Sequence, residues 1–471
     1  MLFNSIAFLL YFPIVCIIYF IIPHAQVRIK NLFLLIASYY FYMSWEPAYV
    51  ILLFISTIIT YLAGLGIEHY HNRKKLFLVG SIVLNLAILF VFKYYNFFSS
   101  CLESLFQTSN FVIHFPEFKL LLPVGISFYT FQALGYSIDV YRGTINAEKD
   151  FITYALFVSF FPQLVAGPIE RAKNLLPQFH KANKFDGDNF IEGVKLMLWG
   201  YFMKLCIADS VSFYVDAVYN NIPNHNGTSI LLATFFFTFQ IFCDFSGYSM
   251  IAIGTARCLG FKLMLNFNRP YLSRSPRDFW HRWHISLSSW FGDYVYKPLG
   301  GSRCSEIKHQ RNLFLTMLIS GIWHGANWTF IVWGGVHGIF LCINSLARKL
   351  FVVKEIKVLV PLKIISTFLI AMFCWIFFRA NTLSDSFLAI KKIFCNPGLL
   401  YNGTGKPAIL LPIILIIILM AKEIKDEFFK KPFMFLHNKN NIVSILGAVF
   451  LIVVIMLCGQ FNGGQFIYFQ F

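Results

Sequence analysis

The stretch from Leu313 to Trp333 reads LFLTMLISGIWHGANWTFIVW and places one histidine, His324, near the middle of a long apolar run. An ionisable side chain inside a membrane is costly, and such groups usually face the bundle interior and serve function. The residues around His324 add small side chains, the flat rings of two tryptophans and one amide, that of Asn327. We therefore interpret this stretch as the lining of a reaction chamber within a membrane protein.

The composition of the whole chain indicates a helical membrane protein. Of its 471 residues, 58% are hydrophobic and 13% are charged, whereas soluble domains carry about 25% charged residues. The apolar segments lack the period-two alternation of a membrane β-barrel, so helices must satisfy the backbone hydrogen bonds in lipid. A net charge of +17 is typical of Lys and Arg gathered in cytoplasmic loops. We expect membrane lipids, and no nucleic acid, as partners.

Apolar runs of about 20 residues predict membrane spans within one domain that covers residues 1–471. Two other stretches, 151–168 and 279–300, are expected to enter the membrane and return. The predicted spans lie near 2–22, 31–44, 47–68, 76–98, 119–141, 190–216, 229–256, 312–333, 358–378, 407–421 and 442–459.

The topology around His324 is ambiguous from loop charges alone. Arg348 and Lys349 look cytoplasmic, which requires the chain to turn back within 312–346, with Gly334–Gly335 as a candidate turn. If a helix starts at Asn312, His324 lies about 18 Å along it, roughly halfway through the hydrocarbon.

The most polar membrane-associated stretch runs from Asn266 to Arg311, and its centre at 278–290 reads DFWHRWHISLSSW. On a continuous helix Trp280, Trp283 and Ser286–Leu287 would share one face. Such a mixture of aromatic and basic residues suits a phosphate-bearing acyl donor, because Arg and Lys pair with phosphate. It equally suits an amphipathic helix on anionic lipid. The candidate donor-binding residues are Trp280, Arg282, Trp283 and Lys297.

The histidines at 281, 284, 324 and 337 raise the hypothesis of a metal site. His281 and His284 do not have the i,i+4 spacing of many helical ligand pairs, and no acidic or cysteine partner stands at a telling distance. We therefore predict no metal. Acyl transfer suits His284 and His324 better, because imidazole can act as a base toward a hydroxyl, and a dry site favours its neutral form.

Two further polar groups could support such chemistry. Asn327 is a candidate donor to an oxyanion, and Asp244 is an acid within a predicted span. A group like Asp244 normally finds a partner in the bundle interior, so we expect it to tie helices together or to orient a histidine. For His324 the alternative is a buried ring that only bonds a backbone carbonyl.

Two motifs, DFWHRWHISLS at 278–288 and GIWHGANW at 321–328, resemble those of the membrane-bound O-acyltransferase (MBOAT) family. The resemblance is strongest to its bacterial alginate and peptidoglycan O-acetylation branch, and it runs in order along essentially the whole chain. The other matching stretches are LPVGISFYTFQ (122–132), FPQLVAGPI (161–169), CDFSGYS (243–249), DYVYKPLGG (293–301) and FIYFQF (466–471).

This resemblance implies an all-α polytopic membrane protein, with a ring of about 11 transmembrane helices and re-entrant segments around a central funnel or tunnel. It implies that His324 is catalytic and that His284 is the second functional histidine, whereas His281 stands where the family often has Arg. It also implies acetyl-CoA or another cytoplasmic acyl thioester as the donor, with no permanently bound cofactor, and an acceptor on the far side of the membrane.

The acceptor is expected to be a cell-wall or extracellular polysaccharide. Because the chain is rich in Phe, Ile, Lys and Asn, which indicates an AT-rich genome, we favour peptidoglycan, with alginate or another exopolysaccharide as the alternative. A separate extracytoplasmic O-acetyltransferase or esterase-like partner would finish the transfer at the bacterial cytoplasmic (inner) membrane. A transporter or flippase without acyl-transfer chemistry is the rival from another class, and a scaffold that only recruits the partner is a third hypothesis.

Overall fold

In the computed structural model the chain folds into helices joined by loops. The structure describes residues 1–109, 113–118, 122–165, 167–350, 357–403, 405, 407–429, 441–461 and 466–467, and within these ranges no β-strand occurs. The all-α prediction is therefore confirmed. The chain divides into two compact units, the first made of residues 1–193 and 255–264, the second of 194–254 and 265–470. The expectation of a single domain stays a prediction.

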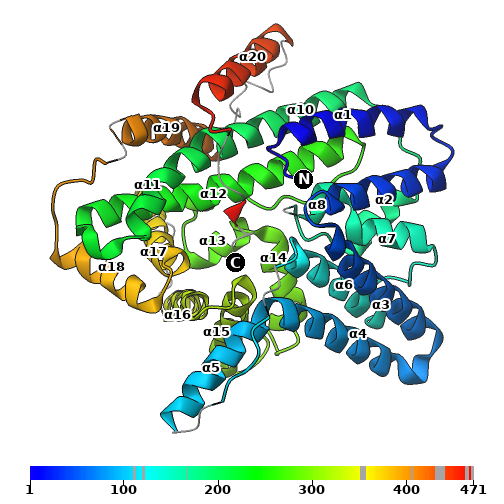
Figure 1. The fold of residues 1–471 in the computed structure, drawn as a ribbon, viewed down its shortest axis with the longest axis horizontal. Coiled ribbons are helices and arrows are strands. Elements are labelled where there is room, and N and C mark those ends of the chain that lie inside the picture. Colours follow the sequence, from blue (N-terminus) through cyan, green and yellow to red (C-terminus); the bar gives the residue numbers. More distant parts are fainter. Residues whose placement is uncertain are drawn as a thin grey trace. The chain divides into compact units, whose positions relative to one another are not determined.

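The first unit is a set of packed helices drawn in blue to cyan in Figure 1. Within it α3 packs against α4 and α6, and α2 packs against α7. The contact between α3 and α6 is close: a Cβ on Gly64 would lie 2.6 Å from the hydroxyl of Tyr136. The helices are α1 (Ile6–Ile21), α2 (Val27–Met43), α3 (Val50–His69), α4 (Lys74–Leu89), α5 (Tyr95–Thr108), α6 (Ile126–Tyr141), α7 (Phe151–Ser159), α8 (Phe161–Leu164), α9 (Ala172–Phe179) and the start of α10 (Gly187–Tyr201).

The second unit contains every residue singled out above as a candidate for the site. A π-helical segment, Phe202–Ala208, joins α10 to α11, and another, Gly292–Tyr296, follows α14. The remaining helices are α11 (Asp209–Tyr219), α12 (Gly227–Cys258), whose last turn belongs to the first unit, α13 (Pro276–Arg282), α14 (Ile285–Phe291), α15 (Glu306–His324), α16 (Trp328–Leu350), α17 (Val360–Arg379), α18 (Leu383–Cys395), α19 (Pro407–Phe428) and α20 (Asn441–Cys458).

Several helical stretches are long and apolar enough to cross a membrane, which requires about 20 residues. Among the described residues five qualify, and three shorter apolar helical stretches, at 6–21, 151–164 and 442–458, accompany them. α7 has nine residues, too few to span, which agrees with the prediction that 151–168 enters and returns. The five stretches are Pro47–His69, His71–Thr108, Gly227–Cys258, Trp328–Leu350 and Val360–Arg379.

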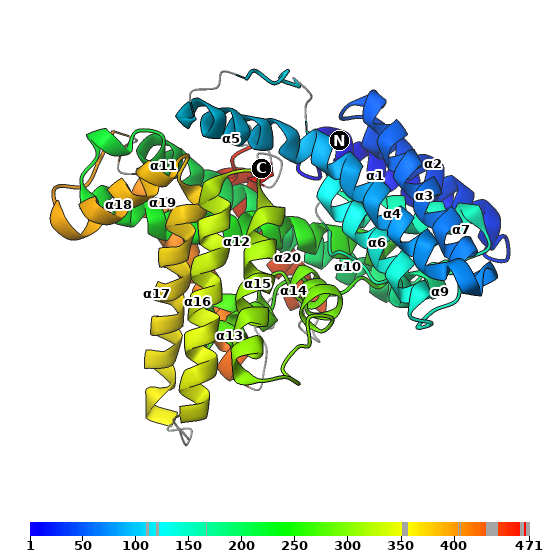
Figure 2. The ribbon, with the colours of Figure 1, turned by 90° about the horizontal axis from the view of Figure 1, so that it is seen from below.

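The predicted span at 312–333 is wrong, because this stretch forms the closed end of a helical hairpin. α15 ends at His324 and α16 begins at Trp328, so the chain turns at 325–327 and not at Gly334–Gly335. Figure 2 shows α15 and α16 running side by side, with α17 next to α16. Since α15 starts at Glu306 rather than at Asn312, His324 lies at the end of the helix, about 27 Å from its start at 1.5 Å per residue.

Glycines allow the two helices of this hairpin to approach closely. A Cβ on Gly321 would lie 2.4 Å from the carbonyl oxygen of Phe330, and one on Gly334 would lie 2.5 Å from that of Met317. Small residues at such positions let helix backbones pack tightly in a membrane. At the open end of the hairpin Glu306 forms an ion pair with Lys349. The charged residues before α15 and at the end of α16 therefore lie at the same end of the hairpin, as the loop charges indicated.

Candidate functional site

His324 lies at the closed end of the α15–α16 hairpin, surrounded by aromatic side chains. Only 3% of the residue is exposed. Its ring centroid lies 4.8 Å from that of Trp333 and 5.5 Å from that of Phe378, and both rings meet it edge to face. Such arrangements are favourable for aromatic pairs. The imidazole is thus fixed between α16 and α17 in a largely apolar surrounding.

His284 occupies a break between α13 and α14, and it lies in none of the five described stretches that are long and apolar enough to span a membrane. Its backbone is left-handed, with φ 41° and ψ 55°, and among the described residues only Arg269 shares a positive φ without being glycine. This break interrupts the stretch 278–290, so Trp280, Trp283 and Ser286–Leu287 do not share the face that a continuous helix would give them.

Asn266 holds this break in place. Its carbonyl oxygen accepts a hydrogen bond from the N–H of Ile285 at 2.8 Å. Its side-chain oxygen accepts from the N–H of Ser286 at 3.3 Å and from the Ser286 hydroxyl at 2.8 Å. A left-handed conformation is unfavourable for a residue with a side chain. The hydrogen bonds between Asn266 and the two residues that follow His284 offset this cost and hold His284 in that conformation.

The same amide determines which ring nitrogen of His284 carries the proton. A backbone N–H can only donate, so the bond from Ser286 identifies the Oδ1 end of Asn266, while Nδ2 donates to the Ser249 hydroxyl at 3.1 Å. His284 Nδ1 lies 3.0 Å from this Oδ1 and must therefore donate its proton. Burial lowers the pKa of His284 to about 3, so the ring is neutral near pH 7 and its lone pair is on Nε2.

The two predicted catalytic histidines meet around one indole. The Trp323 ring centroid lies 6.2 Å from that of His284 and 5.0 Å from that of His324. Sequence reasoning named both histidines but missed Asn266, which it gave only as the start of a polar stretch. The available signal was an amide between two apolar residues, Leu265 and Phe267.

The four candidate donor-binding residues lie in different surroundings. Trp283 is 1% exposed and stacks on Phe279 at 5.5 Å, so it belongs to the packed core. Trp280 contacts the rings of Trp333 and His337 and lies close to the His324 surroundings. The side chain of Lys297 is 70% exposed and pairs with Asp293 at 2.6 Å, which places it at the protein surface.

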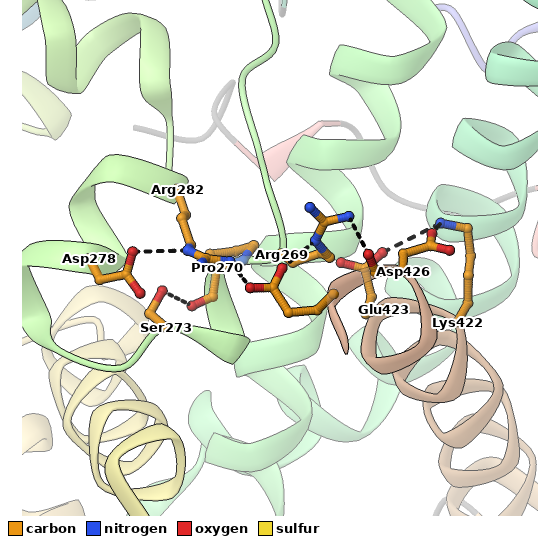
Figure 3. Close-up of polar contacts among 9 residues, drawn as sticks. Arg269, Pro270, Ser273, Asp278, Arg282, Lys422, Glu423 and Asp426 are labelled. Carbon is orange, nitrogen blue, oxygen red and sulfur yellow. Dashed lines mark hydrogen bonds and ion pairs between the residues drawn. The ribbon is translucent and has the colours of Figure 1, made fainter. Parts of the chain in front are cut away.

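Arg282 is part of a row of charged side chains that links α13 to α19, as Figure 3 shows. Its guanidinium lies 3.0 Å from Asp278 and 3.0 Å from Glu427. The other oxygen of Glu427 is 2.7 Å from Nε of Arg269. Two carboxylates therefore already compensate the charge of Arg282, and this cluster favours a role in holding α13 over one in binding phosphate.

Asp244 is buried and tied to other parts of the second unit, as predicted for an acid within a span. It lies 2.5 Å from the ammonium of Lys204, and it accepts a hydrogen bond from the N–H of Ile467 at 2.7 Å. Lys204 also lies 2.7 Å from Asp209. Sequence reasoning missed Lys204 and Asp209, although a lysine within the apolar run 190–216 was a visible signal.

Asn327 caps the helix that follows it. Its side-chain oxygen accepts from the N–H of Thr329 at 3.0 Å, and its amide nitrogen donates to the carbonyl of Asn381 at 3.2 Å. Both ends of the amide thus hold the turn of the hairpin in place, so this geometry offers no support for the predicted oxyanion role. Within the described part of the chain no group of three or more His, Cys, Asp or Glu side chains is placed to hold a metal ion.

Comparison with known proteins finds matches within one family of membrane proteins. The MBOAT, membrane-bound O-acyltransferase family, matches residues 36–384. A probable alginate O-acetylase of Pseudomonas aeruginosa is 41% identical over 399 residues, which cover 84% of this chain and 75% of that protein. A peptidoglycan O-acetyltransferase of Helicobacter pylori is 35% identical over 428 residues, covering 83% and 79%.

A more distant relative is the teichoic acid D-alanyltransferase of Bacillus subtilis, 29% identical over 241 residues, which cover 49% of this chain and 61% of that protein. The family match covers most of the chain and contains both histidines, and the described helices include several long enough to span a membrane. The chain is therefore a multi-pass membrane protein and an O-acyltransferase, and it belongs to the membrane-bound O-acyltransferase family.

Proposed function

We propose that this protein transfers an acetyl group from a cytoplasmic acyl thioester, such as acetyl-CoA, toward a polysaccharide outside the bacterial cytoplasmic membrane. His324 is the general base in this proposal. The observation that carries it is the position of His324, buried at the closed end of the hairpin, with the neutral His284 on the same indole, that of Trp323. A dry, aromatic surrounding favours a neutral imidazole that can accept a proton.

The chemistry follows from the two rings. His324 takes the proton of the acceptor hydroxyl as its oxygen attacks the thioester carbonyl carbon. The carbon–sulfur bond then breaks, and the leaving thiolate takes the proton from His324. His284 presents its Nε2 lone pair and assists by positioning the donor or by relaying the proton, while Asn266 keeps its ring in one tautomer.

Two acceptors are supported by different observations. The composition, rich in Phe, Ile, Lys and Asn, favours a wall polymer of an AT-rich bacterium, and a relative at 35% identity is named a peptidoglycan O-acetyltransferase. The 41% identity to probable alginate O-acetylases favours alginate at least as strongly. In either case a separate extracytoplasmic O-acetyltransferase or esterase-like protein completes the transfer.

The test of this proposal uses the full-length protein in two assays. Purified protein with a labelled acetyl thioester is expected to release the thiol and to move the label to a hydroxyl acceptor. In the native cells, deletion of the gene is expected to remove ester-linked acetate from isolated peptidoglycan, or from alginate where that polymer is made. Transport of an intact solute without thioester cleavage would contradict the proposal, and the polymer that loses acetate identifies the acceptor.

Replacing Asn266 tests the role of the His284 tautomer. Asn266→Ala removes the acceptor at Nδ1, and we expect kcat/KM to fall by about 10- to 100-fold, less than the roughly 10⁴-fold seen when a triad carboxylate is lost. Asn266→Asp places a carboxylate beside Nδ1 and raises the pKa of His284. The acid limb of the kcat/KM profile is then expected to move to higher pH, because protonation of His284, whose pKa burial lowers to about 3 in the wild type, would begin at a higher pH.

The contrast between these variants separates positioning from simple structural support. Ser249→Ala is the matched control, because it removes the partner of Nδ2 and leaves the His284 contact in place. It is expected to retain the wild-type pH profile. An Asn266→Asp protein that is folded and has an unshifted acid limb would refute the assignment.

A further inference from the structure

A second group of rings lies beside His324 and has no role in the mechanism so far. We name it the indole box: Trp280 of α13, Trp333 and His337 of α16, and Trp375 of α17. The Trp280 and Trp333 ring centroids each lie 5.0 Å from that of His337, and the Trp375 ring lies 5.9 Å from that of Trp333. The box adjoins the catalytic centre because the Trp333 ring also contacts His324 at 4.8 Å.

The polar atoms of the indole box have one property in common. The indole nitrogens of all three tryptophans and Nε2 of His337 are buried, and none makes a hydrogen bond with any residue that the structure describes. Trp333 and Trp375 are fully buried, and His337 is 2% exposed. Buried polar groups are nearly always paired, because an unmade hydrogen bond inside a protein is costly. Four such atoms in one cluster point to a polar guest group.

The chemistry of the box restricts what this guest can be. An indole N–H only donates, so the guest must offer an acceptor oxygen. The four members include no Arg or Lys, so a phosphate or carboxylate would bring an uncompensated charge into a buried aromatic site, which is unfavourable. A neutral carbonyl oxygen fits both conditions, and its growing negative charge during acyl transfer would strengthen the hydrogen bonds.

We propose that the indole box binds the carbonyl oxygen of the acyl thioester, with the Trp333 N–H as the principal donor; this inference rests on the proposed function. As the acceptor oxygen attacks the carbonyl carbon and its proton passes to His324, the carbonyl oxygen becomes an oxyanion that the box stabilises. The oxyanion then re-forms the carbonyl, the carbon–sulfur bond breaks, and the thiolate receives the proton from His324. The box thus takes the role expected earlier of Asn327, whose amide holds the hairpin turn.

The test compares single tryptophan variants of the full-length protein in acetyl transfer. Trp333→Phe keeps an aromatic ring but removes the N–H, and kcat is expected to fall by about 100-fold, as when one oxyanion donor is lost. Trp199→Phe is the matched control: its indole nitrogen is also buried and unpaired among the described residues, but its ring packs on Phe202 of the π-helical segment. The control is expected to keep the wild-type kcat.

A spectroscopic readout makes the inference testable even if Trp333→Phe lowers the amount of folded protein. The probe is a non-cleavable ketone analogue of acetyl-CoA with a ¹³C-labelled carbonyl. When it binds the wild type, the carbonyl stretch is expected to move to lower frequency, and His337→Phe or Trp333→Phe should reduce that shift. A carbonyl that is equally unshifted in all proteins, as when the box holds only water, would overturn the inference.

The two proposals fail in different ways. If the wild type cleaves and transfers the thioester but Trp333→Phe has the same kcat, the indole box is not the carbonyl site and the proposed function stands. If the wild type itself transfers no acetyl group, the proposed function fails. The ketone probe then still decides whether the box binds a carbonyl.

Discussion

Replacing His324 by alanine is expected to lower acetyl transfer by about 10²- to 10⁴-fold, the usual contribution of a general base. The protein should still insert and fold. The hairpin that carries His324 is held by the close approach of Gly321 and Gly334 to the opposite backbone and by the cap from Asn327, and none of these contacts uses the imidazole. The loss therefore falls on kcat, because proton removal from the hydroxyl is the step that the ring serves.

The measurement is ester-linked acetate on the isolated polymer, together with thioester turnover by the purified variant. His281→Ala is the matched control, since this exposed histidine lies on α13, three residues before His284, and should leave turnover unchanged. His324→Gln keeps a polar side chain without a comparable base and should be as inactive as the alanine variant. Wild-type acetylation by a folded His324→Ala protein would remove His324 from the mechanism.

Sequence reasoning located the two histidines because each is an ionisable group in an apolar or aromatic setting, and because both lie in recognisable motifs. It could not place the turn at 325–327, since Gly-Ala-Asn is apolar enough to be read as part of one continuous span. The deciding contacts, those of Gly321 and Gly334 with the facing backbone, join residues on two helices and are invisible in a hydropathy profile. The hairpin therefore could not be predicted from the hydropathy of the sequence.

The break at His284 was hidden for a related reason. Its left-handed backbone is imposed by Asn266, a residue outside any helical repeat that includes 278–290. Helical periodicity assumes that local residues decide the conformation, and here a buried amide from another segment decides it. The ion pair between Arg282 and Glu427 was hidden from sequence reasoning in the same way, because Glu427 lies on α19, far along the chain.

The second large effect is expected from Lys204, the buried lysine that joins two acids. Its ammonium lies 2.7 Å from Asp209 and 2.5 Å from Asp244, and all three side chains are at most 5% exposed. Lys204→Ala would leave two carboxylates facing each other without a cation. Breaking a buried ion pair by removing one partner costs about 3–5 kcal/mol, so we expect much less folded protein in the membrane and a lower melting temperature.

The position of this triad explains why the effect should spread beyond one pair. Lys204 lies in the π-helical segment Phe202–Ala208, and Asp244 lies on α12 and also accepts a hydrogen bond from the N–H of Ile467. The lysine thus fixes the segment between α10 and α11 to α12, the helix that also carries the Ser249 partner of Asn266. Loss of Lys204 should therefore weaken the support of His284 as well as the fold.

Charge removal separates electrostatics from packing at this triad. If the unpaired carboxylates cause the instability, Lys204→Met combined with Asp209→Asn and Asp244→Asn should recover part of the lost melting temperature, since uncharged groups of similar size avoid the desolvation penalty. Lys297→Ala, which breaks an exposed pair with Asp293, should change it little. If Lys204→Ala were as stable as the wild type, the triad would contribute nothing to the fold, and the link from Lys204 through α12 to His284 would have to be abandoned.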